Sequence, residues 1–383
     1  MTVPLSPRTP LAVLAGVGAL VALSACDSTD SASGGSGAAG AIKVEASDST
    51  CAVAANTANA GNVTFEITNK GTKVTEFYLY AEGDRIMGEV ENIAPGLNRR
   101  LIVEVPEAGK YQTACKPGMV GNGIRGDFTV TGGAQKQTDT NAQKAEATKN
   151  YATYVANNTA ALETETQKFV DLVKAGKVDE AKSEYASTRV YYERIEPVAE
   201  KFGDLDPLID VREADLEPGQ QFTGFHRLEK DLWVTGLQPD SSQVADKLLT
   251  DVKDLVTKTK TLQLSALDLA NGAKGLLDEV ATGKITGEEE TFSHTDLWDF
   301  QANVDGSKGA IASLRPILQE RDPALVSTLD KKFANVQSLL DKTRVGDGFK
   351  YYNQLSQDEI KAFASAVDAL SEPLSKVAEV VSK

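Results

Sequence analysis

The stretch GGAQKQTDTNAQ (residues 132–143) divides the sequence into two parts whose apolar residues repeat with different periods. The stretch itself has no apolar periodicity, which is typical of a linker. Before it, NVTFEITN alternates Val63, Phe65 and Ile67 with polar residues, as a half-buried strand does. After it, apolar residues return at helical spacing. The sequence therefore predicts a β domain followed by an α-helical domain.

The β domain is predicted to span residues 41–131. Beyond NVTFEITN, the segments LIVEVPEAGKYQTAC (101–115) and GDFTVTG (126–132) read as further short strands separated by turn residues. Several short strands with turn signals between them favour a β-sandwich.

The helical domain is predicted to span residues 144–383. Tyr151, Val155, Leu162 and Phe169 fall on one face of a helix. Similar amphipathic runs continue to the C-terminus with short connections and almost no strand signal, which indicates an all-α bundle. The expected fold class is thus multidomain, with a β-sandwich followed by a helical bundle.

The N-terminus has the pattern of an export signal. A short segment with one positive charge, Arg8, precedes the apolar run 11–23, which is too short for a comfortable membrane span. The run ends in LSAC, which resembles a bacterial lipobox with Cys26 as the lipidated residue. A plain signal peptide with an incidental cysteine is the alternative. We therefore predict a lipoprotein signal peptide over residues 1–26 and an extracytoplasmic protein anchored to the cell membrane.

Residues 27–40 are predicted to form a flexible tether, because they are mostly Gly, Ser, Ala and Asp. A chain of this kind and length has a root-mean-square reach of roughly 20 Å. The formal net charge of the whole chain is −15. Nucleic-acid binding needs a basic surface, so this function class is excluded.

The β domain contains no histidine, although blue-copper sites use two histidines, a cysteine and a weak axial methionine. The segment CKPGM supplies Cys115 and Met119 only. Two readings stay open. In an oxidising setting Cys51 and Cys115 would form a disulfide. Alternatively, both cysteines and Met119 would bind a soft ion such as Cu(I), together with Glu89 or Glu91.

Several candidate metal ligands of the helical domain are spaced along the sequence so that they share helix faces. Glu193 and Glu196 lie three residues apart, as do His226 and Glu229, so each pair shares a helix face. Asp210 follows the first pair near an expected helix junction. An imidazole and a carboxylate on one face can bind the same ion.

The segment GEEETFSHTDLWDF adds Glu289, Glu290, His294 and Asp296, so both histidines of the chain lie beside carboxylates. Taken singly, acidic pairs are usually solvated helix faces and a lone histidine is usually structural. The coincidence of both histidines with clustered carboxylates favours a site. Such ligands suit iron, manganese or zinc.

Binding is better supported than catalysis. The zinc-peptidase motif His-Glu-x-x-His is absent, and the inverted motif fails because Lys230 stands where its last histidine would be. No Gly-x-Ser-x-Gly elbow occurs either. We expect a protein that is not an enzyme, with a metallopeptidase as the alternative.

GFHRLE (224–229) resembles the Gly-x-His-x-x-Glu signature of the imelysin-like family, exported helical proteins once described as peptidases. YASTRVYYERIEP (185–197), TGEEETFSHTDLWDFQANVDGS (286–307) and ENIAPG (91–96) are similar to a subgroup of that family. Its members join a cupredoxin-like domain to an imelysin-like domain and serve bacterial iron uptake outside the membrane. The resemblance covers about residues 41–383.

This resemblance implies that the protein captures ferrous or ferric iron through His226 and Glu229, with the acidic residues named above nearby. It further implies delivery to a membrane oxidase-permease, alongside a haem-containing peroxidase of the same system. The cupredoxin-like domain would bind copper or ferric iron, or would assist iron oxidation.

Overall fold

The computed structural model describes residues 40–105, 107–132, 142–216 and 219–383, and residues 40–383 form one compact unit. The predicted signal peptide, most of the tether and most of the linker lie outside the described residues. Among the described helices, none is both long and apolar enough to cross a membrane.

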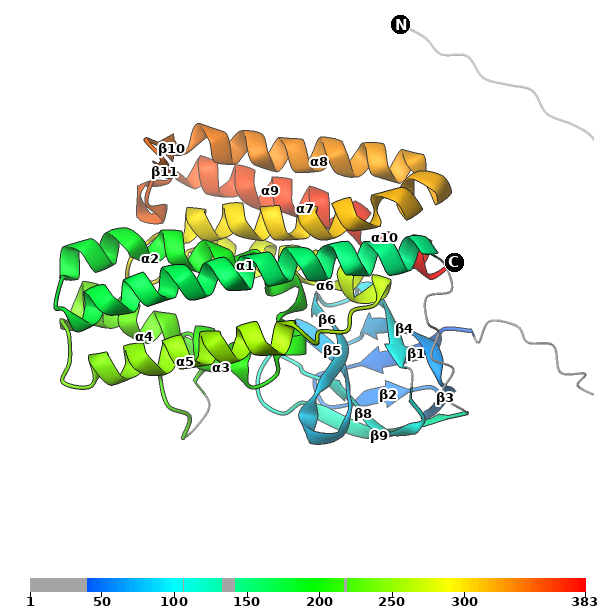
Figure 1. Cartoon of the computed structure of the whole chain (residues 1–383). Coiled ribbons are helices and arrows are strands. Elements are labelled where there is room, and N and C mark those ends of the chain that lie inside the picture. The colour runs from blue at the N-terminus through cyan, green and yellow to red at the C-terminus, as the bar shows by residue number, and fades with distance from the viewer. Residues whose placement is uncertain (1–39, 106, 133–141, 217–218) are drawn as a thin grey trace, which may run out of the picture. The chain divides into compact units, whose positions relative to one another are not determined.

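The N-terminal domain is a sandwich of two β-sheets with the strand orders β2-β1-β4-β7 and β3-β9-β8-β5-β6 (Figure 1). Its strands are β1 (Ile42–Ala46), β2 (Cys51–Val53), β3 (Thr57–Asn59), β4 (Gly61–Asn69), β5 (Thr75–Tyr80), β6 (Ile86–Ile93), β7 (Asn98–Val105), β8 (Gly109–Cys115) and β9 (Ile124–Thr131). The phenyl ring of Phe65 lies 5.0 Å from that of Phe77 and 5.4 Å from that of Phe128, which joins the two sheets through one apolar core.

The alternation in NVTFEITN is confirmed. Val63, Phe65 and Ile67 of β4 are buried, and they pair across the antiparallel β4–β7 ladder, with Phe65 opposite Leu101. A shift of one residue would turn these side chains to the other face of the sheet. The hydrophobic pattern therefore sets the register of this strand pair.

A disulfide joins Cys51 at the start of β2 to Cys115 at the end of β8, with their Cα atoms 5.5 Å apart. It connects the two sheets across the sandwich. Both sulfur atoms are used in this bond, so neither cysteine is available as a thiolate ligand for copper. Met119 lies on the β8–β9 connection and is 41% exposed, and the carboxylate of Glu91 lies 3.3 Å from the Tyr78 hydroxyl.

We expect the double variant Cys51→Ala/Cys115→Ala to unfold more easily, because the bond closes a long loop with a sequence separation of 64. The chain-entropy model predicts a loss of about 4 kcal/mol in the free energy of unfolding. Urea denaturation measures this loss. Alkylation under denaturing conditions, followed by intact mass, should find neither cysteine modified before reduction; two modified thiols would contradict the disulfide.

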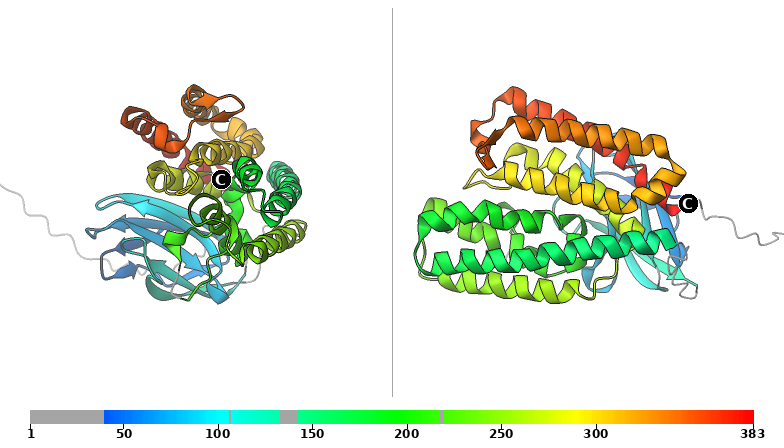
Figure 2. Two further views of the ribbon diagram at one scale, coloured as in Figure 1. Left: turned by 90° about the vertical axis from the view of Figure 1, so that its left-hand side faces the viewer. Right: turned by 45° about the horizontal axis from the view of Figure 1, so that its top comes forward.

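The C-terminal domain is a helical bundle in which the long helices run alongside one another (Figures 1 and 2). Helix α1 packs against α2, α5 and α7, while α8 packs against α7 and α9. The helices are α1 (Ala142–Lys174), α2 (Val178–Glu193), α3 (Leu205–Asp210), α4 (Gly224–Lys230), α5 (Ser241–Thr259), α6 (Ala266–Thr282), α7 (Asp296–Arg321), α8 (Pro323–Lys342), α9 (Gln357–Leu374) and α10 (Val377–Ser382).

The predicted apolar face of α1 is confirmed, because Tyr151, Val155, Leu162 and Phe169 are all fully buried. The region between α2 and α5 is less regular than the rest of the bundle. Here the chain passes through short 3₁₀ segments, α3, α4 and one π-helical turn (Asp231–Thr235). Short elements turn more side chains inward from different directions than a single long helix could, and this region supplies Asp210 and His226 to the candidate site.

Candidate metal centre

His226 is positioned by the first turn of α4. Gly224, the first residue of that helix, has φ +80, and a Cβ atom there would overlap the carbonyl oxygen of Ile209. Only glycine tolerates both this backbone conformation and this close approach. The start of α4 therefore packs directly against the end of α3, and Asp210, the last residue of α3, lies beside His226.

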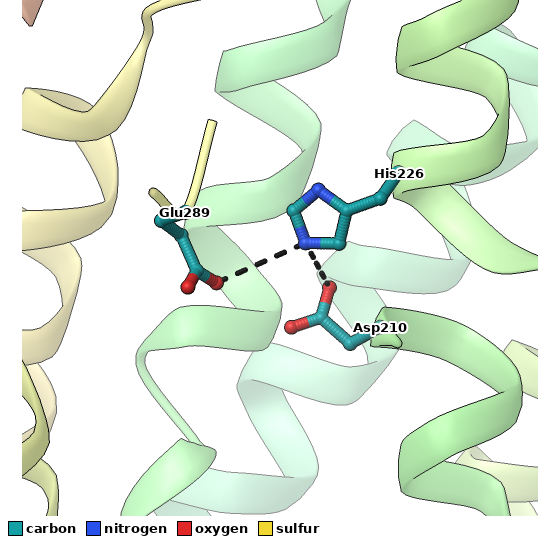
Figure 3. Close-up of side chains that lie close together, drawn as sticks. All are labelled: Asp210, His226 and Glu289. Atoms are coloured by element: carbon teal, nitrogen blue, oxygen red, sulfur yellow. Dashed lines mark ion pairs between the residues drawn. The ribbon is translucent and has the colours of Figure 1, made fainter. Parts of the chain in front are cut away.

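The side chains of Asp210 and Glu289 converge at His226 (Figure 3). Its Nε2 lies 3.6 Å from Oδ1 of Asp210 and 3.8 Å from Oε1 of Glu289. The imidazole is buried, yet no described residue hydrogen-bonds to Nε2. Buried polar atoms are rarely left without a partner. The three donor atoms are close enough to share one metal ion.

The other ring nitrogen faces a second group of carboxylates. Nδ1 of His226 lies 3.2 Å from Oε2 of Glu229, while Oε1 of Glu229 accepts the backbone N–H groups of Phe292 and Ser293 at 2.9 and 2.7 Å. Glu290 approaches the same two side chains closely enough to form another three-ligand group with them. The histidine thus stands between two sets of oxygen atoms.

Arg189 of α2 is the central cation of this region and is fully buried. Its guanidinium pairs with Glu193 and Asp210, and it lies 2.6 Å from Glu290 and 3.2 Å from Glu289. Burial opposes its charge, but these carboxylates hold the pKa of Arg189 well above its usual value. Arg189 therefore keeps its charge and draws four carboxylates together.

Lys284 is a second buried cation. Its Nζ lies 2.8 Å from both carboxylate oxygens of Glu196, 3.0 Å from Oε2 of Glu193 and 3.4 Å from Oε1 of Glu289. Asn303 donates to Glu193 and Glu196 at 2.9 and 2.7 Å. The structure thus places Glu193 and Glu196, which we predicted as iron ligands, around a lysine ammonium instead of beside the imidazole.

Carboxyl groups outnumber the fully buried cations around His226. Burial and the charge of Glu229 raise the pKa of Glu290 well above its usual value, and burial together with the charge of Glu193 does the same for Asp299. Groups with raised pKa values hold their protons to a higher pH than usual. An incoming cation would compete with these protons for the carboxyl oxygens.

A cavity of about 310 Å³ leads to the imidazole. Besides His226, Glu229 and Glu289, its lining includes the acidic residues Glu213, Asp215 and Glu288. Arg212 lies across it, 3.2 Å from Glu288 and 3.3 Å from Glu289. An acidic wall attracts cations, so this cavity offers a route for a metal ion to Nε2.

The second histidine is not part of this arrangement. His294 has φ +60, its backbone N–H donates to the Glu290 carbonyl at 2.8 Å, and it belongs to neither three-ligand group. Arg189 and Lys284 were missed by sequence reasoning. The spacing of Arg189 four residues before Glu193, among tyrosines, could have indicated the first of them. No comparable signal exists for Lys284.

Comparison with known proteins agrees with this architecture. A family model described as imelysin matches residues 147–377, and one described as a cupredoxin-like domain matches residues 15–130. The chain therefore belongs to the imelysin family, and it carries a cupredoxin-like domain in front of the imelysin domain.

Individual relatives point to one kind of protein within the imelysin family. The iron uptake system component EfeO of Escherichia coli O157:H7 is 41% identical over 329 residues, which cover 84% of this chain and 86% of that protein. The proteins of the same name from E. coli K12 and Shigella flexneri are 40% identical with the same coverage. The chain is thus an EfeO-like protein. Auracyanin from Roseiflexus castenholzii is 18% identical, and the match covers 25% of this chain and all of auracyanin. The TM-score of 0.21 is too low to establish a shared fold.

We expect Gly224→Ala to disrupt the centre, because a methyl group would force α4 away from α3 and separate His226 from Asp210. The strain should lower the free energy of unfolding by at least about 2 kcal/mol and weaken metal binding. Gly275→Ala is the matched control, since a Cβ at this helical position meets nothing within 4 Å. Thermal unfolding and metal titration of both variants test this; equal behaviour would contradict the role of Gly224.

Asp296 should make the metal-free protein less stable as the pH rises towards neutrality. Burial raises the pKa of Asp296 to about 7, and this side chain is fully buried. Because the folded-state pKa lies above the unfolded value of 3.8, the stabilisation is fully present below pH 3.8 and is lost progressively as the pH rises to about 7, where the loss levels off. Between pH 5 and pH 8, the free energy of unfolding of Asp296→Asn should rise by about 2–3 kcal/mol relative to that of the parent chain. Urea denaturation with a chelator present measures the difference, and a pH-independent difference would contradict it.

Proposed function

We propose that this protein is a lipid-anchored, extracytoplasmic carrier that captures iron between Asp210, His226 and Glu289 and passes it to a membrane oxidase-permease. The observation that carries this proposal is the unpartnered, buried Nε2 of His226 between two carboxylates. A ligand atom in this state is ready to bind a cation at no cost in broken hydrogen bonds.

The choice of iron rests on the ligand set. One imidazole with carboxylate oxygens suits hard or borderline ions, and the excess of acidic groups suits a highly charged one. The relatives named above are components of iron uptake systems. Either Fe²⁺ or Fe³⁺ fits these ligands. The buried thiols that a Cu(I) site would need are joined in a disulfide.

We further propose binding without turnover. A zinc peptidase positions a free carboxylate as the general base next to a metal-bound water. Glu229, the acidic residue nearest to the imidazole, is buried; its Oε1 accepts two backbone N–H groups and its Oε2 lies 3.2 Å from Nδ1 of His226. Both of its oxygens are thus in contact with protein groups, which does not suit a general base that must activate water.

The partners and the location follow from the family and from the N-terminus. A chain of this family that collects iron outside the membrane needs an acceptor within it, and the oxidase-permease with its haem-containing peroxidase would fill that role. The LSAC sequence ending at Cys26 supports lipidation at the membrane surface. The tether would then let the carrier approach the permease.

We expect iron titration to quench tryptophan fluorescence saturably at one equivalent. Trp233 is the reporter, because its ring lies 5.4 Å from that of Tyr185, whose hydroxyl lies 3.3 Å from Glu290. His226→Ala should weaken binding by at least about 100-fold, since it removes a ligand of an ion held by few others.

The matched control is His294→Ala, which removes the other histidine and should bind iron as the parent chain does. Iron retained after desalting, measured by elemental analysis, checks the stoichiometry independently of fluorescence. Equal iron binding by the parent chain and His226→Ala would refute the proposed site.

A further inference from the structure

The two nitrogen atoms of His226 have opposite surroundings. Nδ1 lies 3.2 Å from a carboxylate oxygen of Glu229. An ionised carboxylate has no proton to donate, so it can act only as a hydrogen-bond acceptor. Nε2 has no hydrogen-bond partner among the described residues. A neutral imidazole carries one proton, and the nitrogen next to an acceptor holds it. The arrangement therefore selects the tautomer with the proton on Nδ1.

Glu229 is itself held rigidly. While Oε2 faces the imidazole, Oε1 accepts the N–H groups of both Phe292 and Ser293, at 2.9 and 2.7 Å. The side chain is 1% exposed. To coordinate an ion together with Nδ1, Glu229 would have to give up its contact with the ring. The next carboxylate, Glu290, is also engaged, by Arg189 Nε at 2.6 Å and by the Ser293 hydroxyl at 2.8 Å.

The carboxylate oxygens near Nε2 lie at distances close to those expected between two ligands of one ion. Two ligand atoms that each lie about 2.1 Å from one tetrahedral ion are about 3.4 Å apart. Nε2 lies 3.6 Å from Oδ1 of Asp210 and 3.8 Å from Oε1 of Glu289. The same two oxygens pair with Arg189, so an ion at Nε2 would draw them inward and replace part of that pairing. Figure 3 shows both carboxylates pointing to this nitrogen.

We propose that Glu229, the acidic residue of the Gly-x-His-x-x-Glu motif, is a positioning residue and not a metal ligand. It accepts the Nδ1 proton of His226 and so presents Nε2 to an ion held with Asp210 and Glu289. Carboxylates in this outer position fix the ring and make its free nitrogen more basic. This inference rests on the proposed function, because it assigns roles within the same centre.

The test is nuclear magnetic resonance of the full chain labelled with ¹⁵N-histidine, titrated with Zn²⁺ as a diamagnetic probe. The chain has only two histidines, so His294→Gln assigns both rings. We expect the free His226 to carry its proton on Nδ1. Zinc should shift the Nε2 resonance while Nδ1 keeps its proton.

The variant Glu229→Gln provides the second measurement. Its amide group would face Nδ1 and reverse the tautomer, so the affinity for Zn²⁺ and Fe²⁺ should fall about 10–100-fold while one ion still binds at saturation. Asp251→Asn is the control, because this carboxylate is also buried and paired with a cation, Lys247, but lies in α5 outside both three-ligand groups. It should keep both the parent tautomer and the parent affinity.

Loss of the Nδ1 proton on zinc binding, or equal weakening in Asp251→Asn, would overturn the positioning role and leave the proposed function standing. If instead neither metal binds and neither ring nitrogen shifts, the proposed function itself fails. The spectrum of the unmutated chain decides between these outcomes even if a variant does not fold.

Discussion

The helical domain depends on the charge of Arg189. A guanidinium with no exposed surface is stable in a protein only when carboxylates surround it, and removing one partner of such a set costs several kcal/mol. Four carboxylates from three separate segments lie within 3.2 Å of this group, and a fifth, Asp299 of α7, lies 3.7 Å from it. The Arg189 guanidinium therefore holds the ends of α2 and α3 and the segment before α7 together. These ion pairs place Asp210 and Glu289 beside the imidazole.

The two domains are stabilised by different kinds of interaction. The sandwich is small and relies on an aromatic core with a covalent bond between its sheets. The bundle has long helices with an extensive apolar core, and it can support a buried group of charges. The candidate metal centre lies where regular helices give way to short segments, because several short segments can direct side chains to one point.

Much of the fold could be predicted from the sequence, because hydrophobic period is a local property. The alternation at Val63 and Phe65 and the helical repeat at Tyr151 and Val155 both appear in the structure as expected. The centre could be predicted only in part. His226 was singled out through its spacing to Glu229, and we propose different roles for these two residues; spacing does not reveal which oxygen is already hydrogen-bonded.

Glu193 and Glu196 illustrate the limit more clearly. Their spacing correctly places both on one side of the chain, but it cannot tell which cation they face. In the structure that cation is Lys284, which lies far along the sequence and has no local signal. The pairing of Cys51 with Cys115 was likewise left open, because the distance between two strands of different sheets is set by tertiary packing.

The lysine ammonium among the oxygens of Glu193, Glu196 and Glu289 has a consequence for release. The iron carrier proposed above would have to release its ion as well as bind it, and a site lined by carboxylates alone would hold a multivalent ion tightly. The Lys284 ammonium cannot diffuse away, and it would repel an ion bound close by. In such a carrier it would shorten the time that the ion stays bound while it holds the carboxylates in place.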